Sequence, residues 1–402
     1  MISSETIKYS IKNLLQRKSR SFLTILSIFV GITAIFVFIS FGLGLYRYVD
    51  EVSSSSSAEL ILVQPRGGTV PGLDDTFSLN DDDLDAVDKA KGVFEASGVY
   101  FTTVEMTQEN TRRYTFIIGY DPKVPLIMDS FNIDLAKGRM LESGDEGKVL
   151  LGYNYQIPDK IFPKGYDTGD RIEVNGKKLR IIGFLESVGN PQDDSQVYVT
   201  NGYIKELFDD ESINYGMIVA RVDTSDIEGV VENVEKELRK ERGLEEGKED
   251  FFVQSYEELL NTYMSVLDVI VGFIILIALI SVLVSAVNTA NTMITSVLER
   301  VKEIGVIKSV GARNSEIFKI FLFESSFLGF VSGLVGVIAG WFIAFVSGII
   351  LENLGWAFLS PFYPWQLFLG CIIFATVTGG ISGFFPAYQA SKLKPVDALR
   401  YE

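Results

Sequence analysis

The chain has 402 residues, of which 47% are apolar and 22% are charged, and its formal net charge is -16. It contains one cysteine, Cys371, and no histidine. The composition therefore excludes Ser-His and Cys-His catalysis, His-ligated metal sites and a disulfide framework within the chain.

The apolar residues are concentrated in four runs, each long enough to cross about 30 Å of hydrocarbon as a helix. We expect an α-helical membrane protein with four transmembrane helices and an α+β extracytoplasmic domain inserted between the first and second. The expected segments are an amphipathic N-terminal helix (1–21), the first span (22–45), the extracytoplasmic domain with a helical stalk (46–268), the second span (269–294), a cytoplasmic coupling segment (295–326), the third span (327–351), a short external loop (352–364), the fourth span (365–385) and a cytoplasmic tail (386–402).

The charge distribution predicts the orientation of these segments. Residues 50–260 contain 22 Lys and Arg against 43 Asp and Glu, whereas the rest of the chain contains 14 against 9. Basic residues near spans favour the cytoplasmic side. We therefore expect a multi-pass protein of the plasma membrane, with both termini in the cytoplasm and the acidic domain outside.

The N-terminal segment leaves two interpretations open. Ile7, Ile11, Leu14 and Leu15 fall on one helical face, and basic residues surround them. This pattern is typical of an interfacial helix on anionic headgroups, but the same basic residues are also a simple topology signal.

The extracytoplasmic domain combines strand and helix patterns. Asn175-Gly176 lies between two alternating runs and predicts a tight hairpin, since both turn positions need positive φ. Ser255 and Glu258 have capping-box spacing and predict the start of a helix that continues without a break into the second span. The expected strands cover residues 60–63, 99–104, 114–118, 149–151, 171–174, 177–182 and 197–199, the expected helices cover 81–90 and 227–242, and the domain has room for two subdomains.

Two groups of residues in the spans indicate helix packing. A polar stripe in the second span is expected to face the bundle or a partner chain rather than lipid; a substrate path is the alternative. Four glycines on one face of the third span allow another helix to approach closely. The stripe comprises Asn288, Asn291, Thr292 and Thr295, and the glycines are Gly329, Gly333, Gly336 and Gly340.

Two clusters of aspartate residues have spacings that resemble those of metal ligands. Asp81, Asp83 and Asp85 have the first spacings of a calcium loop, but Ala86 replaces the glycine that such a loop needs. They are better interpreted as the acidic first turn of a helix capped by Asn80 or Ser78. Asp193 and Asp194 predict a solvated turn after Pro191 rather than a metal site.

A charged segment between the second and third spans has its own amphipathic pattern. Val297, Val301, Ile304 and Ile307 recur at helical spacing, while Glu299, Arg300, Lys302 and Glu303 fall largely on the other side. Such a segment offers charged and apolar faces to a cytosolic protein. No phosphate-binding loop is present, because Gly169 and Gly176 are seven residues apart and Lys177 is followed by lysine.

Three separate stretches resemble the MacB/FtsX/LolC-type permeases of ABC transporters. They are IKYSIKNLLQRKSRSFLTILSIFVGI near the start, ERVKEIGVIKSVGARNSEIFKIFLFES in the middle and FPAYQASKLKPVDALRYE at the close. The resemblance implies a MacB-like periplasmic core domain joined to an FtsX-like permease domain. The chain would not itself be an enzyme, since the resemblance implies a cytoplasmic ATPase subunit, in two copies, that binds ATP and Mg²⁺.

The resemblance also assigns residues and partners. A second permease protomer, the lipid membrane and, left open, an external partner protein are implied, and no nucleic acid. ATP hydrolysis would move the extracytoplasmic domain by mechanotransmission, for export or extraction of a hydrophobic, peptide or lipoprotein-like substrate. The residues expected to dock the ATPase are Glu299, Arg300, Glu303, Ile304, Gly305, Lys308, Gly311 and Ala312.

A second class of function stays open at this point. An FtsX-like signal transducer would use the same helices to activate an extracellular hydrolase. Binding of such a hydrolase by the external domain would favour this alternative, and stimulation of ATP hydrolysis by a peptide or amphiphile would favour export. A passive receptor or adhesion domain does not explain the charged segment after the second span.

Overall fold

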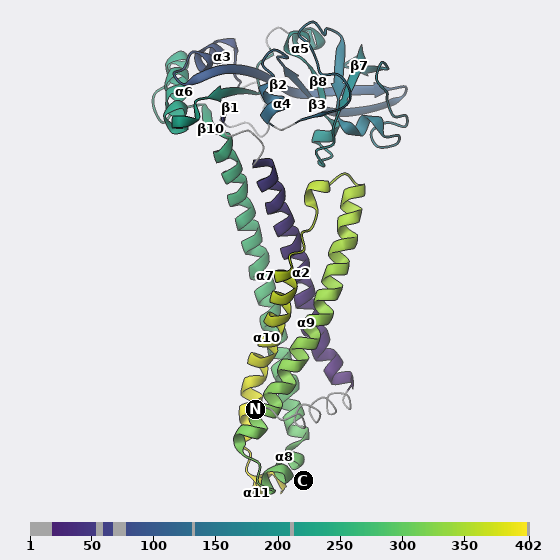
Figure 1. Cartoon of the computed structure of the whole chain (residues 1–402), viewed down its shortest axis with the longest axis vertical. Coiled ribbons are helices and arrows are strands. Elements are labelled where there is room, and N and C mark those ends of the chain that lie inside the picture. The colour runs from purple at the N-terminus through teal and green to yellow at the C-terminus, as the bar shows by residue number, and fades with distance from the viewer. Residues whose placement is uncertain (1–17, 54–58, 67–77, 131–132, 210–212, 400–402) are drawn as a thin grey trace. The chain divides into compact units, whose positions relative to one another are not determined.

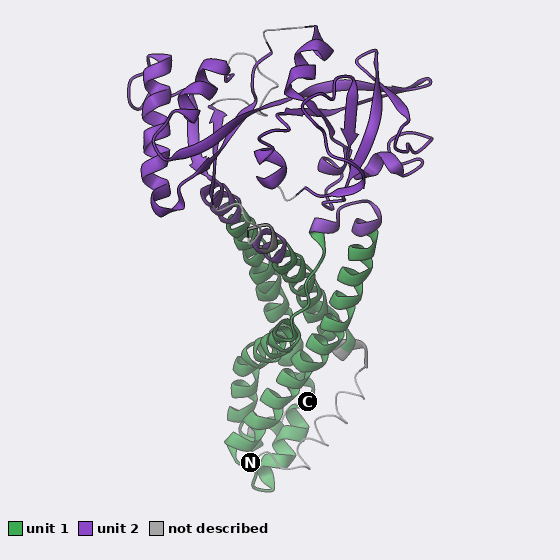
Figure 2. Cartoon of the chain, turned by 45° about the horizontal axis from the view of Figure 1, so that its top comes forward, with its two compact units in different colours: residues 1–45, 266–350, 359–402 green, residues 46–265, 351–358 purple. Residues whose placement is uncertain are grey.

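The computed structural model describes residues 18–53, 59–66, 78–130, 133–209 and 213–399. The chain forms two compact units (Figure 2), one of residues 1–45, 266–350 and 359–402 and the other of residues 46–265 and 351–358. The described part of the first is mainly helical, and that of the second is an α/β unit. The expected fold class, with a mixed domain inserted between the first two spans, is confirmed. The interfacial helix predicted for residues 1–21 lies almost wholly outside the described residues.

The helical unit contains the membrane-spanning candidates. Within the described residues, four helices are long and apolar enough to cross a membrane. Short helices follow the second and the fourth of them. The helices (Figure 1) are α2 (Lys18–Ser53), α7 (Tyr256–Glu299), α8 (Val301–Ser309), α9 (Asn314–Asn353), α10 (Trp365–Lys392) and α11 (Pro395–Leu399).

Three of these helices pack tightly through the glycine face of α9. A Cβ built on Gly329 would lie 2.4 Å from the carbonyl oxygen of Ala375 in α10, and one on Gly336 would lie 3.1 Å from Ile32 in α2. Gly333 likewise faces α10, and Gly340 faces Phe36 of α2. The absent side chains therefore let α9 approach two neighbours at once.

Helix α10 extends further than the sequence predicted. We expected the fourth span to end at residue 385 and a cytoplasmic tail to follow, and proline inside a helix removes a backbone donor and clashes with the preceding turn. In the structure Pro386 lies inside α10, which continues to Lys392. Pro386 and Ala387 are buried there, so packing compensates for the lost hydrogen bond.

The α/β unit is built on one twisted sheet with the order β10-β1-β9-β2-β3-β8-β5-β7-β4, and β6 pairs with β2 and β7. Strand β2 joins its two halves, since residues 93–99 pair with β9 and residues 100–108 pair with β3. The strands are β1 (Leu60–Pro65), β2 (Val93–Gln108), β3 (Thr111–Tyr120), β4 (Leu135–Gly138), β5 (Lys148–Leu151), β6 (Arg171–Val174), β7 (Lys177–Leu185), β8 (Val197–Thr200), β9 (Met217–Val222) and β10 (Phe251–Ser255).

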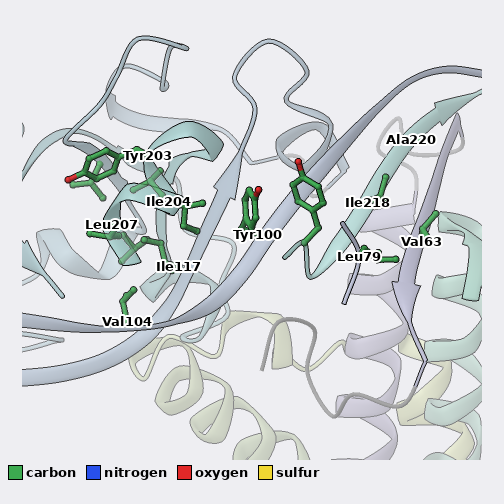
Figure 3. Close-up of a cluster of buried hydrophobic side chains, with 14 of the residues drawn as sticks. Val63, Leu79, Tyr100, Val104, Ile117, Tyr203, Ile204, Leu207, Ile218 and Ala220 are labelled. Carbon is green, nitrogen blue, oxygen red and sulfur yellow. The ribbon is translucent and has the colours of Figure 1, made fainter. Parts of the chain in front are cut away.

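Helices cover this sheet and close its core. They are α3 (Asp81–Asp88), α4 (Leu126–Ser130), α5 (Asn201–Phe208) and α6 (Ile227–Arg242), with single turns η2 (Tyr153–Gln156), η3 (Asp193–Ser195) and η4 (Thr224–Asp226). Figure 3 shows Ile204 and Leu207 of α5 beside Ile117 of β3 in one buried cluster. In the same cluster the rings of Tyr100 and Tyr215 lie 4.5 Å apart.

Two local predictions in this unit are confirmed. Asn175 and Gly176 have φ of 47° and 76° and close the β6–β7 hairpin. The Asn175 side chain also accepts a hydrogen bond from the backbone of Glu105, so the turn is tied to β2. At the other end of the unit, Ser255 and Glu258 form the predicted capping box, and α7 starts at the next residue, Tyr256.

Candidate coupling site

The segment between the second and third long helices is a separate short helix held by two kinks. Helix α7 ends at Glu299, Arg300 leaves the helical geometry with φ -109° and ψ 14°, and α8 starts at Val301. After α8, Gly311 has φ 108°, a conformation that favours glycine, and α9 starts at Asn314. The non-helical geometry of Arg300 and Gly311 therefore defines the two ends of α8.

Arg300 ties α8 to α9 from inside the helical unit. Its side chain is 6% exposed, and it donates to Glu324 of α9 over 3.2 Å and to Glu303 of α8 over 3.0 Å. Its guanidinium also lies 5.2 Å from the centre of the Phe321 ring. A planar cation with several donors can hold two carboxylates and an aromatic face at once.

Apolar packing fixes the same side of α8. Val301 and Ile304 are buried, and Ile304 belongs to a cluster that includes Val297 of α7 and Ile317 of α9. Gly305 is buried beside them. The helix thus rests on the ends of both long helices that flank it.

Lys308 connects the last turn of α8 to the end of α10. Its ammonium donates to the carbonyl oxygens of Ser391 over 2.8 Å and Leu393 over 2.6 Å. Those carbonyls lie where α10 ends, so a cation there satisfies backbone groups that have no helical partner. Helix α8 therefore contacts α7, α9 and α10.

The exposed side of α8 forms a ridge that we call the α8 ridge. Its members are exposed and recur at helical spacing: Lys302, Glu303, Val306, Ser309 and Val310. Val306 is 51% exposed and Val310 is 85% exposed, an unusual position for two valines on a charged segment. Sequence reasoning missed them, although their offset of four residues on the face opposite Ile304 was a usable signal.

The structure separates the eight residues expected to dock the ATPase into two groups. Glu299, Glu303 and Gly311 are exposed, and Lys308 and Ala312 are half-buried. Arg300, Ile304 and Gly305 are buried, so in this structure they position α8 rather than line its surface. The expectation that Arg300 lies on the polar side was wrong, because the kink at residue 300 turns its side chain toward Glu324.

The polar stripe of α7 lies outside its own bundle. Asn288 and Asn291 are exposed, Thr292 is half-buried, and the hydroxyl groups of Thr292 and Thr295 donate to carbonyl oxygens one turn earlier. The polar side chains that α7 buries are instead Ser285, Thr289 and Ser296. We expected the stripe to face either the helices of its own chain or a partner chain. The exposure of Asn288 and Asn291 excludes the first of these neighbours.

The three aspartates of the first acidic cluster have separate partners, and within the described residues no group of three or more His, Cys, Asp or Glu side chains is arranged to hold a metal ion. Asp81 accepts from Tyr215, Asp83 pairs with Arg242, and Asp85 pairs with Lys89, so the three carboxylates point to different partners. The capping box of α3 uses Asn80 and Asp83, which bears out the helix-start interpretation.

The prediction of a solvated turn at Asp193 and Asp194 was wrong. Asp194 is 3% exposed, and its carboxylate accepts from the hydroxyl of Ser187 and the backbone N–H of Val188. These residues form the single turn η3, which packs closely on Gly152. A proline followed by two aspartates correctly predicts a turn, but it does not predict whether the turn is exposed or buried.

The fold and this segment define a multi-spanning membrane protein with a large inserted α/β domain, and sequence similarity identifies its family. Residues 21–237 match the MacB-like periplasmic core domain, and residues 262–395 match the FtsX-like permease C-terminal domain. The chain belongs to the family of ABC transporter permeases that combine these two domains. It is therefore a membrane protein with an extracytoplasmic domain.

Relatives match along almost the whole chain. An uncharacterized ABC transporter permease of Methanocaldococcus jannaschii is 32% identical over 400 residues, which cover 99% of this chain and 98% of that protein. The ABC transporter permease YknZ of Bacillus subtilis is 28% identical over 416 residues, with 99% of both proteins covered. The macrolide export ATP-binding/permease protein MacB of Marinobacter nauticus is 27% identical over 417 residues, and the chain spans 61% of its length.

Solved structures match about half of the chain at low identity. The extracellular domain of YknZ from Gram-positive bacteria gives a TM-score of 0.39 at 15% identity, covering 48% of this chain and 99% of that chain. The periplasmic region of MacB from Actinobacillus actinomycetemcomitans gives 0.41 at 14% identity, covering 52% and 94%.

Proposed function

We propose that this chain is the permease subunit of an ABC transporter that couples ATP hydrolysis, carried out by a separate cytoplasmic ATPase, to movement of its extracytoplasmic domain. The chain itself would bind no nucleotide; ATP and Mg²⁺ would be bound by the ATPase. The observation that carries the proposal is the construction of α8, which presents an exposed ridge on one side and is bonded to three long helices on the other.

The α8 ridge has the composition of a docking surface. Val306 and Val310 provide apolar area that a partner can remove from water, and Lys302 and Glu303 flank them with charges of both signs. Interfaces commonly combine an apolar centre with a polar rim. A cytoplasmic ATPase, one copy for each of two permease chains, is the partner that the family supplies for this position.

Helix α7 is suited to carry movement from this ridge to the outside. It is unbroken from Tyr256 to Glu299, a length of about 66 Å at 1.5 Å per residue. Its first residue, Tyr256, is buried in the core of the α/β unit, and its last turns bury Met293 and Val297 beside α8. A rod anchored at both ends moves as one body, which is the meaning of mechanotransmission here.

The orientation and the partners complete the proposal. The excess of basic residues in the terminal and α8 segments supports cytoplasmic termini in the plasma membrane and an external α/β unit. A second permease protomer would cover the polar stripe of α7. Export or extraction of a hydrophobic, peptide or lipoprotein-like substrate fits spans that carry no chain of ionisable groups through the bilayer centre.

The test is reconstitution of the permease with an ABC ATPase from the same organism. Val306→Asp and Val310→Asp place charges in the centre of the α8 ridge, and we expect at least about tenfold weaker association with the ATPase, because an unpaired charge resists burial. The permease should still insert and fold. Copurification and permease-dependent ATP hydrolysis measure the effect.

Ser315→Asp is the matched control. It adds the same charge in the first turn of α9, where a carboxylate is favourable and the side chain is exposed, but it lies off α8. Association that survives both valine substitutions, or that is lost equally in all three variants, would contradict docking on the α8 ridge.

A further inference from the structure

The α/β unit contains a cavity of about 310 Å³, within the size range of small-molecule sites. Its floor is apolar and comes from both halves of the sheet: Val99 of β2, Ile118 of β3, Leu185 of β7, Tyr198 of β8 and Met217 of β9. Ile127 of α4 covers one side. All of these side chains except Met217 are buried, so the floor is a fixed part of the domain core.

One end of the cavity is acidic. Glu186 follows β7, and Asp193 and Asp194 belong to η3; all three line the cavity, and no lysine or arginine does. In the described part of the chain none of these three carboxylates pairs with a basic side chain. Elsewhere in the same unit buried carboxylates are paired, as Asp145 is with Arg139 and Asp83 is with Arg242.

Hydrogen bonds hold the acidic end in place without neutralising it. Asp193 accepts from the side-chain amides of Asn190 and Gln196 over 2.7 and 2.9 Å. Asp194 accepts from Ser187 and the backbone of Val188. Each carboxylate oxygen can accept a second hydrogen bond, so both groups retain capacity for a charged donor. Burial and the neighbouring Asp194 raise the pKa of Asp193, the effect that a bound cation would relieve.

We propose that this cavity binds a compact hydrophobic cation, with its apolar body on the sheet floor and its ammonium group at Asp193. An anionic ligand would meet three uncompensated carboxylates, and a purely apolar one would leave them unpaired. Binding requires neither nucleotide nor ATPase. The proposal of binding therefore stands independently of the function proposed above. A further step, that the bound cation is a transported substrate, would rest on that function.

The position of the cavity gives the ligand access to a spanning helix. Tyr48, in the part of α2 that belongs to the α/β unit, also lines the cavity. Its ring lies 5.8 Å from that of Phe358, whose backbone N–H donates to Gly189 between β7 and η3. A ligand bound at Asp193 would therefore lie in a cavity that Tyr48 of α2 also lines.

The test uses the full chain in lipid nanodiscs and three probes with one apolar cage: 1-adamantanamine, 1-adamantanol and adamantane-1-carboxylate. Calorimetric titration without ATPase should give at least about tenfold tighter binding of the amine than of the alcohol, since a hydrogen bond to a charged group is worth that much. The carboxylate should bind most weakly. This comparison needs no variant, so it stands even where a substitution disturbs folding.

Two substitutions locate the binding. Asp193→Asn should reduce the preference for the amine by about tenfold while the alcohol binds as before. Met217→Trp fills the cavity from β9 and should abolish binding of all three probes. Any heat that remains with this variant measures uptake of the probe by lipid and can be subtracted. Asp82→Asn removes the same charge from an exposed position on α3, outside the cavity, and should change nothing.

Equal binding of the amine and the alcohol would overturn the proposal, as would tighter binding of the carboxylate. An amine affinity unaffected by Met217→Trp would place the probe elsewhere and overturn it as well. If the wild-type permease does not associate with the ATPase but binds the amine as expected, only the function proposed above is rejected.

Discussion

Asp145 is a buried carboxylate shared by two cations. Its side chain is 3% exposed, and it accepts from both terminal nitrogens of Arg139 over 2.6 and 2.8 Å and from Lys148 over 2.6 Å. The hydrogen bonds from Arg139 are the main reason that its pKa is held well below the usual range of about 4; those from Lys148 and the backbone of Glu142 contribute further.

The Asp145→Asn substitution should destabilise the protein by about 2 kcal/mol at neutral pH, a value reduced from that of a fully buried pair because Arg139 is 42% exposed. Since the pKa is depressed in the folded state, the contribution is complete above about pH 4 and is lost as the pH falls toward the folded pKa. Thermal unfolding of both proteins between pH 7 and pH 3 measures it.

Glu146→Gln is the control for this prediction, because Glu146 is the next residue, is exposed and changes the net charge equally. It should shift the unfolding temperature little at any pH. A difference between wild type and Asp145→Asn that stays constant down to pH 3 would contradict the role assigned to the carboxylate.

Single residues also show where sequence reasoning stops. Helical periodicity placed Val301 and Ile304 correctly on the buried side of α8. It failed for Arg300, since the kink at that residue breaks the register between α7 and α8. It also failed for Asp194, whose burial depends on Ser187, seven residues earlier, and on Gly152 in another strand connection. Local pattern cannot report contacts made by distant segments.

At the scale of elements, the close packing of α9 on α10 predicts that one glycine-to-alanine substitution destabilises the protein, although such a substitution in a helix normally stabilises it. Replacing glycine by alanine inside a helix normally stabilises it by up to about 1 kcal/mol. Gly329→Ala should instead destabilise the helical unit by about 1–3 kcal/mol, because the new Cβ would meet the backbone oxygen of Ala375, which cannot move aside cheaply.

Gly370→Ala is the matched control on α10, where a Cβ would meet no heavy atom within 4 Å. It should be neutral or stabilising. Thermal unfolding of the purified protein in detergent measures both variants. An unfolding temperature raised equally by the two substitutions would show that α9 and α10 do not pack as described.

The attachment of α8 gives a second prediction for an element. Glu324→Gln removes the carboxylate that Arg300 reaches across to α9, leaving a buried cation with a weaker partner. Helix α8 should then open more often, and trypsin should cut after Lys302 or Lys308 severalfold faster. Mass spectrometry of timed digests of the purified protein gives the rates.

Glu352→Gln serves as the control for the digestion experiment. Glu352 is exposed near the opposite end of α9, so its substitution changes the charge of the same helix without touching α8. Equal cleavage rates in Glu324→Gln and wild type would mean that apolar packing alone holds α8.

Elements differed in how well the sequence predicted them, according to how locally their structure is determined. The β6–β7 hairpin depends on two turn residues, and its first strand was predicted with correct bounds at residues 171–174, whereas β7 continues three residues past the predicted end at 182. Helix α6 has the predicted bounds, residues 227–242. Strands β4, β9 and β10 and helices α4 and α5 were not predicted. Strand β9 lies between β1 and β2, more than a hundred residues earlier, so only the folded sheet defines it.

At the scale of the whole molecule, α7 is the candidate span whose apolar segment is least buried by the rest of the described chain. Only 6% of its apolar window is buried, against 22 to 33% for the other three candidate spans. Lipid can cover the apolar part of that surface, but it offers no hydrogen bonds to Asn288 and Asn291. A second copy of the chain, related by twofold symmetry, would place these amides opposite each other.

Cysteine cross-linking tests this assembly, because Cys371 is the only natural cysteine and can be replaced by alanine. In that background Asn288→Cys, Asn291→Cys and Thr295→Cys should form disulfide-linked dimers in membranes, since a disulfide needs Cα atoms within about 7 Å. Ser285→Cys, which is buried against Ser27 of α2, and Ile343→Cys, which is exposed on α9, should remain monomeric on non-reducing gels. Cross-linking that is equal at all five positions would reflect random collision, and dimers formed through Ile343→Cys alone would move the interface from α7 to α9.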